Sequence, residues 1–422
     1  MKYKKMWQEL GLDIDKHCGL LEVLTTSYSS VYLDQPYRSE GMEYLDFVLS
    51  EAHGLRIEEL VKAKEEGKKV VGTFCLYMPE EFIVALNAIG VGLCGGVNFE
   101  PENVQSLLGT RNICPLIQSF MGFKLSSVCP YFEVADLLIG ENTCDGKKKV
   151  YEVLGDLQDT YVVDLPSRID SKEGYQYFKK EMKTLIQRLE KLTGNKLNSE
   201  NLVLGIKKVN AKRKALEKLY SFRKKKKLPI SGKDALLISQ IAFYDDLDRF
   251  TEKINKLNFE LENTPDYVPG SENMKRILVT GTPMALPNWK IHDIVEKTGE
   301  AVVVCEETCT GTRYFENSFE PTGNFKQDLE NIYKHYSDIH CACFSPNAER
   351  DEDILRLAKE YSADGVIVNN LLFCSDYAVE NSRVETMLKE EGIPSIRLET
   401  DYSQADIESL TTRIEAFIES LE

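Results

Sequence analysis

The chain has 422 residues, of which 42% are apolar and 28% charged. This length predicts two or three domains, and the composition is typical of a globular protein rather than a disordered one. The 68 acidic residues outnumber the 52 basic ones, and the net charge of −16 argues against general binding to nucleic acid. We find no apolar run of the ~18 residues that a membrane span needs and no secretory h-region, so we expect a cytoplasmic protein without a membrane partner.

The first 168 residues are expected to form an α/β lobe with a helical lead over roughly residues 1–65. Short β-branched runs predict strands at 70–74 and 91–94. The helix predicted between these strands ends at Gly90. A strand, a helix and a second strand in this order indicate a parallel sheet.

Residues 169–270 are rich in Lys, Glu and Leu and predict long amphipathic helices. Within them, residues 207–227 hold eleven Lys or Arg residues against a single acid, Glu217. This basic block has two interpretations. It is either a solvated helix face or a docking patch for an acidic partner or a phosphate-bearing ligand.

Residues 271–422 repeat the alternation of strands and helices predicted for the first lobe. A helix is expected to start at Pro287 and to end at Gly299. The strands of this lobe are predicted at 277–280, 301–305, 365–368 and 395–398. The predicted fold is therefore α/β, with two similar doubly wound parallel-sheet lobes, a helical lead and a helical middle segment.

An internal repeat aligns cysteines of the two lobes. Residues 135–154 and 363–388 each pass from a buried strand into a loop with a cysteine, then an acid and a helix. Cys374 lies 230 residues after Cys144, and Cys343 lies 229 residues after Cys114. Two cysteines at nearly the same offset indicate a shared role rather than chance packing.

The third cysteine of each lobe aligns less well. Cys75 follows the first strand of the first lobe, but its counterpart in the second lobe is Thr282 or Pro283. The second lobe instead carries Cys309 after its second strand. Each lobe thus offers three loop cysteines at the carboxyl ends of its strands, where open α/β sheets bind ligands.

Three converging thiolates per lobe favour an iron–sulfur cubane, because soft thiolates select iron–sulfur clusters, zinc or cuprous copper. A cubane with three cysteine ligands leaves one iron open to substrate, water or a bridging sulfide. Zinc is the alternative in the second lobe, where Cys305 and Cys309 form one pair and Cys341 and Cys343 another. Zinc gives no reason for the repeat in the first lobe.

Five stretches then point to a known family: CPLIQSFMGF, ENTCDGKKKVYEVL, TGTPMALPNWKIHDIVEKTGEAVVVCEETCTGTRYF, SADGVIVNNLLFCSDYAVEN and LETDYSQADIESLTTRIEAFIE. They resemble the 2-hydroxyacyl-CoA dehydratase D-component superfamily and, within it, the double-cubane cluster proteins. The resemblance runs from about Lys68 to the end of the chain.

The resemblance implies a cofactor and partners. Dehydratase components work as heterodimers of related chains with one cubane each. Double-cubane proteins are homodimers, and each chain holds an [8Fe-9S] cluster of two cubanes joined by a bridging sulfide. A separate iron–sulfur ATPase, the activator, supplies low-potential electrons for the ATP-dependent reduction of small molecules. The sequence has no phosphate-loop motif of its own, which fits this division of labour.

Carried over to this sequence, the resemblance implies two sets of cluster ligands. Alternatives stay open within three pairs: Cys75 or Cys94, Cys309 or Cys305, and Cys343 or Cys341. Cys18 and Cys129 are expected to be structural. The ligands proposed for one cubane are Cys75, Cys114 and Cys144, and those for the other are Cys309, Cys343 and Cys374.

Three functional hypotheses follow. The first is a reductase component with the double cubane. The second is a 2-hydroxyacyl-CoA dehydratase subunit with one [4Fe-4S] cluster, and the third is an electron-transfer protein without its own substrate. Two independent [4Fe-4S] clusters also fit the spacing. His292, Glu307 and His340 are candidate proton donors by position in the sequence alone.

Overall fold

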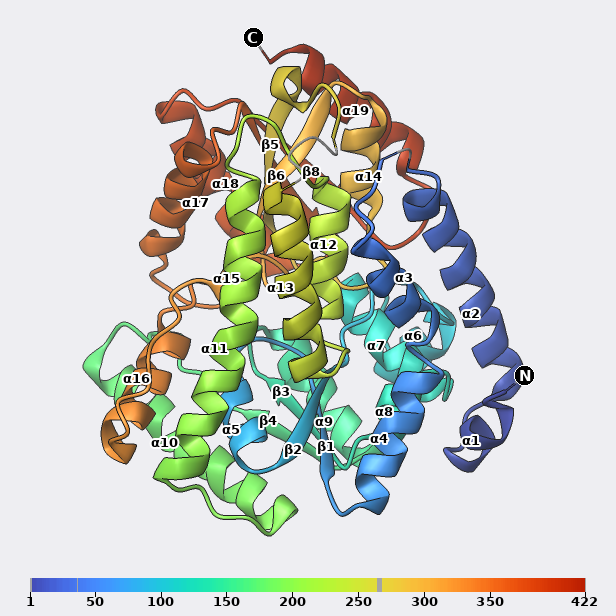
Figure 1. The fold of residues 1–422 in the computed structure, drawn as a ribbon, viewed down its shortest axis with the longest axis vertical. Coiled ribbons are helices and arrows are strands. Elements are labelled where there is room, and N and C mark those ends of the chain that lie inside the picture. The colour runs from blue at the N-terminus through green and yellow to red at the C-terminus, as the bar shows by residue number, and fades with distance from the viewer. Residues whose placement is uncertain (1, 36, 264–267, 422) are drawn as a thin grey trace.

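The computed structural model describes residues 2–35, 37–263 and 268–421. Two α/β lobes lie one above the other, and long helices of the middle segment run along both (Figure 1). The helical lead packs along one side, with α1 (Lys4–Glu9), α2 (Ile14–Tyr28), a π-helical turn η1 (Ser29–Leu33), α3 (Met42–Ser50) and α4 (Leu55–Glu65).

The N-terminal lobe is built on one parallel sheet with the strand order β2-β1-β3-β4. Thr73 of β1 lies opposite Gly92 of β2 and Ile139 of β3, so these three strands end at one edge. The strands are β1 (Lys69–Thr73), β2 (Ala88–Gly92), β3 (Leu137–Glu141) and β4 (Thr160–Val163). The helices are α5 (Glu80–Ala85), α6 (Pro101–Leu108), α7 (Pro115–Leu125), α8 (Pro130–Val134) and α9 (Asp145–Leu157).

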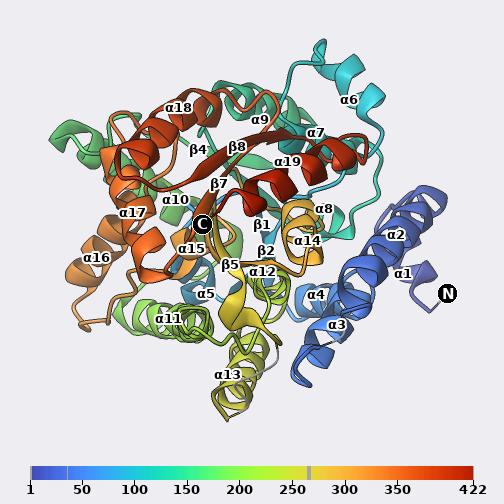
Figure 2. The same ribbon diagram turned by 90° about the horizontal axis from the view of Figure 1, so that it is seen from above.

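The C-terminal lobe repeats this topology, with a parallel sheet in the order β6-β5-β7-β8. The strands are β5 (Lys275–Gly281), β6 (Ala301–Glu307), β7 (Gly365–Leu371) and β8 (Ser395–Thr400). The helices are α14 (Lys290–Lys297), α15 (Thr312–Phe315), α16 (Phe325–Ser337), α17 (Ala348–Glu360), α18 (Ser375–Glu390) and α19 (Ile407–Glu419). Figure 2, seen from above, shows α17 and α18 on one side of this sheet and α14 on the other. The two-lobe α/β fold is therefore confirmed, and the matching strand orders support the internal repeat.

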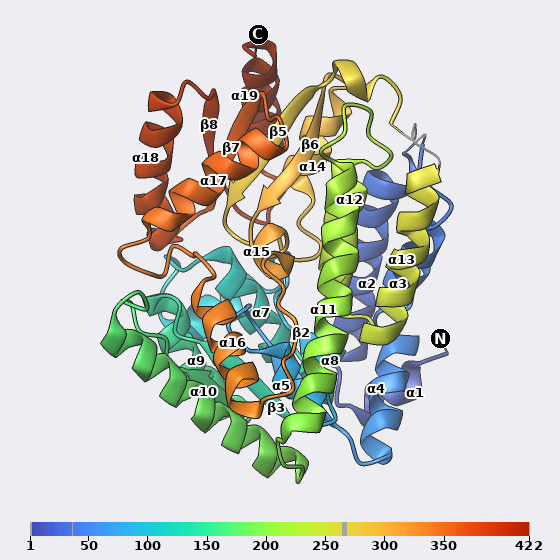
Figure 3. The same ribbon diagram turned by 60° about the vertical axis from the view of Figure 1, so that its left-hand side comes forward.

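The middle segment connects the lobes. It forms α10 (Lys172–Thr193), α11 (Ser199–Phe222), α12 (Gly232–Ile241), α13 (Leu247–Asn263) and a 3-10 turn η2 (Ser271–Asn273). Figure 3 shows α11 running from the upper lobe to the lower one. Arg213 of α11 pairs with Glu81 in the N-terminal lobe at 2.7 Å, and Arg223 pairs with Glu306 in the C-terminal lobe at 2.6 Å. One helix thus holds both lobes through buried ion pairs.

Two predicted helix boundaries were wrong. The helix predicted between the first two strands, α5, ends at Ala85, and Asn87 has a left-handed φ of 58°. Gly90, the expected end of that helix, instead lies within β2. In the second lobe, α14 begins at Lys290 rather than at Pro287, which follows a cis peptide bond. Positions 264–267 of the predicted middle segment lie outside the described residues.

Candidate functional site

A cavity of about 240 Å³ lies between the carboxyl ends of the two sheets. Both lobes contribute thiols to its wall. Seven cysteines line it: Cys75, Cys114, Cys144, Cys309, Cys341, Cys343 and Cys374. The structure thus brings all six predicted ligands to one cavity, although the ligand set itself stays a prediction.

Local structure explains how several of these thiols reach the cavity. Cys144 is the N-cap of α9, and its sulfur accepts a hydrogen bond from the backbone N–H of Lys147 at 3.3 Å. Cys374 occupies the same place before α18, and Cys114 precedes α7, which opens with a proline. A helix start presents free N–H groups and a positive dipole, both of which stabilise thiolates.

Thiols pair across the two lobes. The Cys75 thiol lies beside that of Cys309, and the Cys114 thiol beside that of Cys374. The contact with Cys75 lowers the pKa of Cys309, and the contact with Cys374 lowers the pKa of Cys114. Metals bind the thiolate, so these contacts favour the metal-binding form of one thiol in each pair. The cysteines of the two lobes thus lie close together at one cavity.

The alternative ligands occupy different environments. Cys305 is fully buried within β6 and does not line the cavity. Cys94 lines a neighbouring pocket, where its thiol donates to the carbonyl oxygen of Phe74 at 2.7 Å. Cys341 does line the cavity, and its sulfur lies 3.5 Å from the hydroxyl oxygen of Tyr377. The choice between Cys341 and Cys343 therefore stays open.

The three candidate proton donors have structural partners. His292 is buried and lies 2.7 Å from Glu306, and His340 lies 2.6 Å from Asp353. Glu307 pairs with Arg313 and Arg350. None of the three is among the described residues that line the cavity.

The basic block at 207–227 is largely neutralised within the chain. Seven of its cations pair with acidic side chains. These cations are Lys208, Lys212, Arg213, Lys214, Lys218, Arg223 and Lys224. Two of the pairs, those of Arg213 and Arg223, are fully buried. Most of these cations therefore pair with acids of the same chain. This leaves little free positive charge for a docking patch.

Sequence reasoning missed Lys147 and Asp376 on the cavity wall. Burial by itself lowers the pKa of Lys147, but Tyr151 and the thiols of Cys75 and Cys94 as anions outweigh burial and raise it. Burial and Cys341 raise the pKa of Asp376 to about 6. The signal was present, because each residue follows a repeat cysteine closely, Lys147 by three positions and Asp376 by two.

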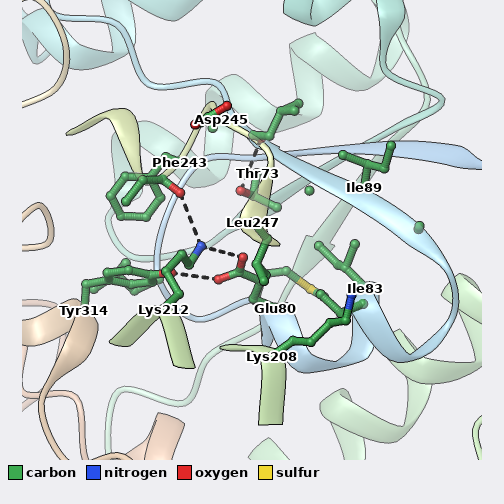
Figure 4. Close-up of a pocket in the computed structure, with 18 of the residues that line it drawn as sticks. Thr73, Glu80, Ile83, Ile89, Lys208, Lys212, Phe243, Asp245, Leu247 and Tyr314 are labelled. Atoms are coloured by element: carbon green, nitrogen blue, oxygen red, sulfur yellow. Dashed lines mark hydrogen bonds and ion pairs between the residues drawn. The ribbon is translucent and has the colours of Figure 1, made fainter. Parts of the chain in front are cut away.

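A second pocket shares Cys75 with the thiol cavity. It has a volume of about 200 Å³, and Cys75 is part of its wall. Within it, Lys212 and Tyr314 both hold the carboxylate of Glu80, at 2.6 and 2.8 Å (Figure 4). A space of about 60 Å³, lined by Phe243, Cys75 and Cys309, shares wall residues with both this pocket and the thiol cavity.

Residues 75–421 match the family model described as 2-hydroxyglutaryl-CoA dehydratase, D-component. A protein of Escherichia coli strain K12, named as dehydratase subunit YjiM, is 33% identical over 88% of this chain and 96% of its own length. The (R)-phenyllactyl-CoA dehydratase beta subunit of Clostridium sporogenes is 25% identical over 85% and 93%. One of the subunits of the benzoyl-CoA reductase of Thauera aromatica is 19% identical over 85% and 92%.

Within the described ranges, no helix combines the length and the apolar character that crossing a bilayer requires.

Proposed function

Because the chain belongs to the 2-hydroxyglutaryl-CoA dehydratase D-component family, we propose that it is the iron–sulfur reductase component of an activator-dependent enzyme. It holds a double-cubane [8Fe-9S] cluster between its lobes and reduces small molecules. The observation that carries this proposal is the convergence of seven cysteines from two lobes on one cavity.

The number of thiols favours two cubanes over one. A single [4Fe-4S] cluster uses at most four cysteine ligands, one for each iron. Cys75, Cys114 and Cys144 from the first lobe already supply three, and the second lobe supplies four more. The neighbouring thiols of opposite lobes, Cys75 beside Cys309 and Cys114 beside Cys374, favour one linked cluster over two independent clusters.

The donor set fits such a group. Among the described residues, no three His, Cys, Asp or Glu side chains lie close enough to hold a single metal ion. A cubane does not require this arrangement, because each of its irons takes only one protein thiolate. When bound, the cluster would store low-potential electrons and offer them to a substrate. The chain would hold it through Cys75, Cys114, Cys144, Cys309, Cys343 and Cys374.

The chain's own residues would control access to the cluster. The space of about 60 Å³ at Phe243 has Cys75 and Cys309 on its wall, and both also line the thiol cavity. On this proposal, a small substrate would approach the thiols through this space.

Two partners belong to the proposal. A separate iron–sulfur ATPase would act as the activator that delivers electrons, and a second copy of this chain would complete a homodimer. The relatives are named as subunits, which supports a protein that works with partners.

A dehydratase subunit with one [4Fe-4S] cluster is the second candidate, and the name of the Clostridium sporogenes relative favours it. That candidate predicts a different homologous chain as partner and affinity for CoA thioesters. It does not account for thiols of both lobes at one cavity.

The deciding experiment measures iron and acid-labile sulfide per chain after purification without oxygen. We expect about eight iron and nine sulfide for the linked cubanes, against about four of each for a single cubane. A ratio near four to four, together with a co-purifying homologous chain, would replace the proposal with the dehydratase candidate.

Variants test the contribution of each lobe. Cys144→Ser and Cys374→Ser should each lose about half of the iron, because each removes one ligand from one cubane. Cys18→Ser is the matched control, since Cys18 lies in α2 away from the cavity. Full iron retention in both cavity variants contradicts the ligand assignment.

A further inference from the structure

Lys147 reaches the thiol cavity from the first turn of α9. Its side chain is only 7% exposed. It lines both the cavity and the narrow space at Phe243. It is the only lysine or arginine among the described residues that line the cavity.

Among the described residues, Lys147 makes no ion pair with a carboxylate. Three lysines are buried within the described ranges, and two of them pair with carboxylates: Lys212 with Glu80 at 2.6 Å and Lys233 with Asp293 at 3.3 Å. Within the described residues, the Lys147 ammonium has neither a hydrogen bond nor an ion pair. A buried ammonium is stabilised by an anion nearby, and the cavity offers Lys147 the thiolates of its cysteines.

The nearby acid does not supply that anion. Glu141 lies within electrostatic range of Lys147, but both of its carboxyl oxygens are buried without a hydrogen-bond partner. Burial and the neighbouring Cys75 raise the pKa of Glu141 well above its usual range. Glu141 therefore makes no hydrogen bond with the Lys147 ammonium.

The internal repeat breaks at this position. Lys147 follows Cys144 by three residues, and the residue that follows Cys374 by three is Tyr377. Tyr377 contacts Cys341 and accepts a hydrogen bond from Arg313. Arg313 is already paired with Glu307. The unbalanced positive charge therefore lies on the N-terminal side of the cavity only.

We propose that Lys147 is the counter-cation of the thiolate-bound cluster and raises the reduction potential of the half held by the N-terminal lobe. This inference rests on the proposed function. A cluster bound by thiolates is negatively charged, and each added electron increases that charge. A fixed ammonium at the cavity wall stabilises the reduced form more than the oxidised form. Lys147 would thus favour uptake of the first electron in the half of the cluster nearest to it.

Redox titration of the anaerobically purified holoprotein tests this role. In Lys147→Met, the first reduction step should become at least tenfold less favourable, which is about 59 mV for one electron. Lys147→Arg keeps the charge and should stay near the wild-type potential. Lys148→Met is the matched control, because Lys148 is the next residue of α9 and is exposed.

A second readout uses the full chain after iron has been removed with a chelator. If the cluster is the main partner of the Lys147 ammonium, Lys147→Met should lower the melting temperature of the holoprotein more than that of the iron-free protein. A lysine whose stem merely fills space would lower both by the same amount.

The outcomes separate the two proposals. If wild type and Lys148→Met hold eight iron per chain and Lys147→Met keeps the wild-type potential, the inference about Lys147 fails and the proposed function stands. Loss of iron from Lys147→Met but not from Lys147→Arg supports the inference. Loss of iron from both variants overturns the inference, because the loss then follows from the changed shape of the side chain and not from its charge. A wild-type chain without iron overturns both proposals.

Discussion

Replacing Arg223 is the strongest test of how the middle segment holds the C-terminal lobe. Its guanidinium donates two hydrogen bonds to the Glu306 carboxylate, at 2.6 and 2.7 Å, and a third to the carbonyl oxygen of Val303. Tyr220 and His292 complete the shell of Glu306. Both members of the ion pair are fully buried.

We expect Arg223→Met to lower the free energy of unfolding by about 3–5 kcal/mol, because it leaves the Glu306 carboxylate buried without its main partner. This is a large part of the ~5–15 kcal/mol that holds a typical domain folded. The double variant Arg223→Met/Glu306→Gln removes both charges and should recover at least ~2 kcal/mol of the loss. Lys214→Met on the same helix breaks only an exposed pair with Glu320 and should change the free energy by less than ~1 kcal/mol.

The pH dependence gives a second, independent sign. In the wild type, burial by itself raises the pKa of Glu306, but Arg223 and His292 outweigh burial and lower it. The contribution of Glu306 is therefore complete above the unfolded-state pKa and is lost as the pH falls through the folded-state value. Without Arg223, burial raises the pKa of Glu306, so the variant should lose stability as the pH rises.

Urea unfolding of the iron-free chain measures these differences, with Trp289 as the fluorescent reporter. Trp289 is buried and lies directly before α14. An Arg223→Met variant less than ~1 kcal/mol below the wild type would refute the reasoning, as would a double variant less stable than Arg223→Met alone.

Two further predictions concern packing and pH. Gly205→Ala in α11 should lower the free energy of unfolding by ~1–3 kcal/mol in urea titrations, because the new Cβ would lie 2.5 Å from the backbone oxygen of Glu81. At Gly155 in α9, a new Cβ would meet nothing within 4 Å, so Gly155→Ala should raise the free energy of unfolding by up to ~1 kcal/mol. Equal effects at both sites would contradict the packing argument. Burial and Arg213 lower the pKa of His335 to about 3. His335 therefore makes stability rise with pH between about 3 and 6.5 by up to ~1.4 kcal/mol per unit, and His335→Phe should flatten that part of the pH–stability curve.

The strands were predictable from the sequence, whereas short helix ends were not. Buried parallel strands such as β7 appear as continuous β-branched runs, which give a strong local signal. The end of α5 at Ala85 depends on Asn87 in a left-handed conformation. No sequence pattern shows which Asn residues adopt this conformation. The apolar pattern around Asn87 therefore favoured a longer helix.

The partners of the charged residues were the least predictable feature. The sequence shows how many cations stand at 207–227 but not which acids face them, because Glu81 and Glu306 are distant in the chain. Lys147 was overlooked for the same reason. In the sequence it is one of three consecutive lysines, and only the fold shows that it is the buried one.

The cysteines show how a duplicated lobe can change its positions and keep its number of thiols. After the first strand of each lobe stand Cys75 and Thr282, and after the second strand stand Cys94 and Cys309. The Cys94 thiol is turned to a backbone carbonyl, and the Thr282 hydroxyl donates to the carbonyl oxygen of Asn369. On the proposed function, a cubane needs three thiolates at suitable distances, whichever strand each one follows. An exact positional repeat was therefore never required, and an alignment of the two lobes alone could not choose between Cys75 and Cys94.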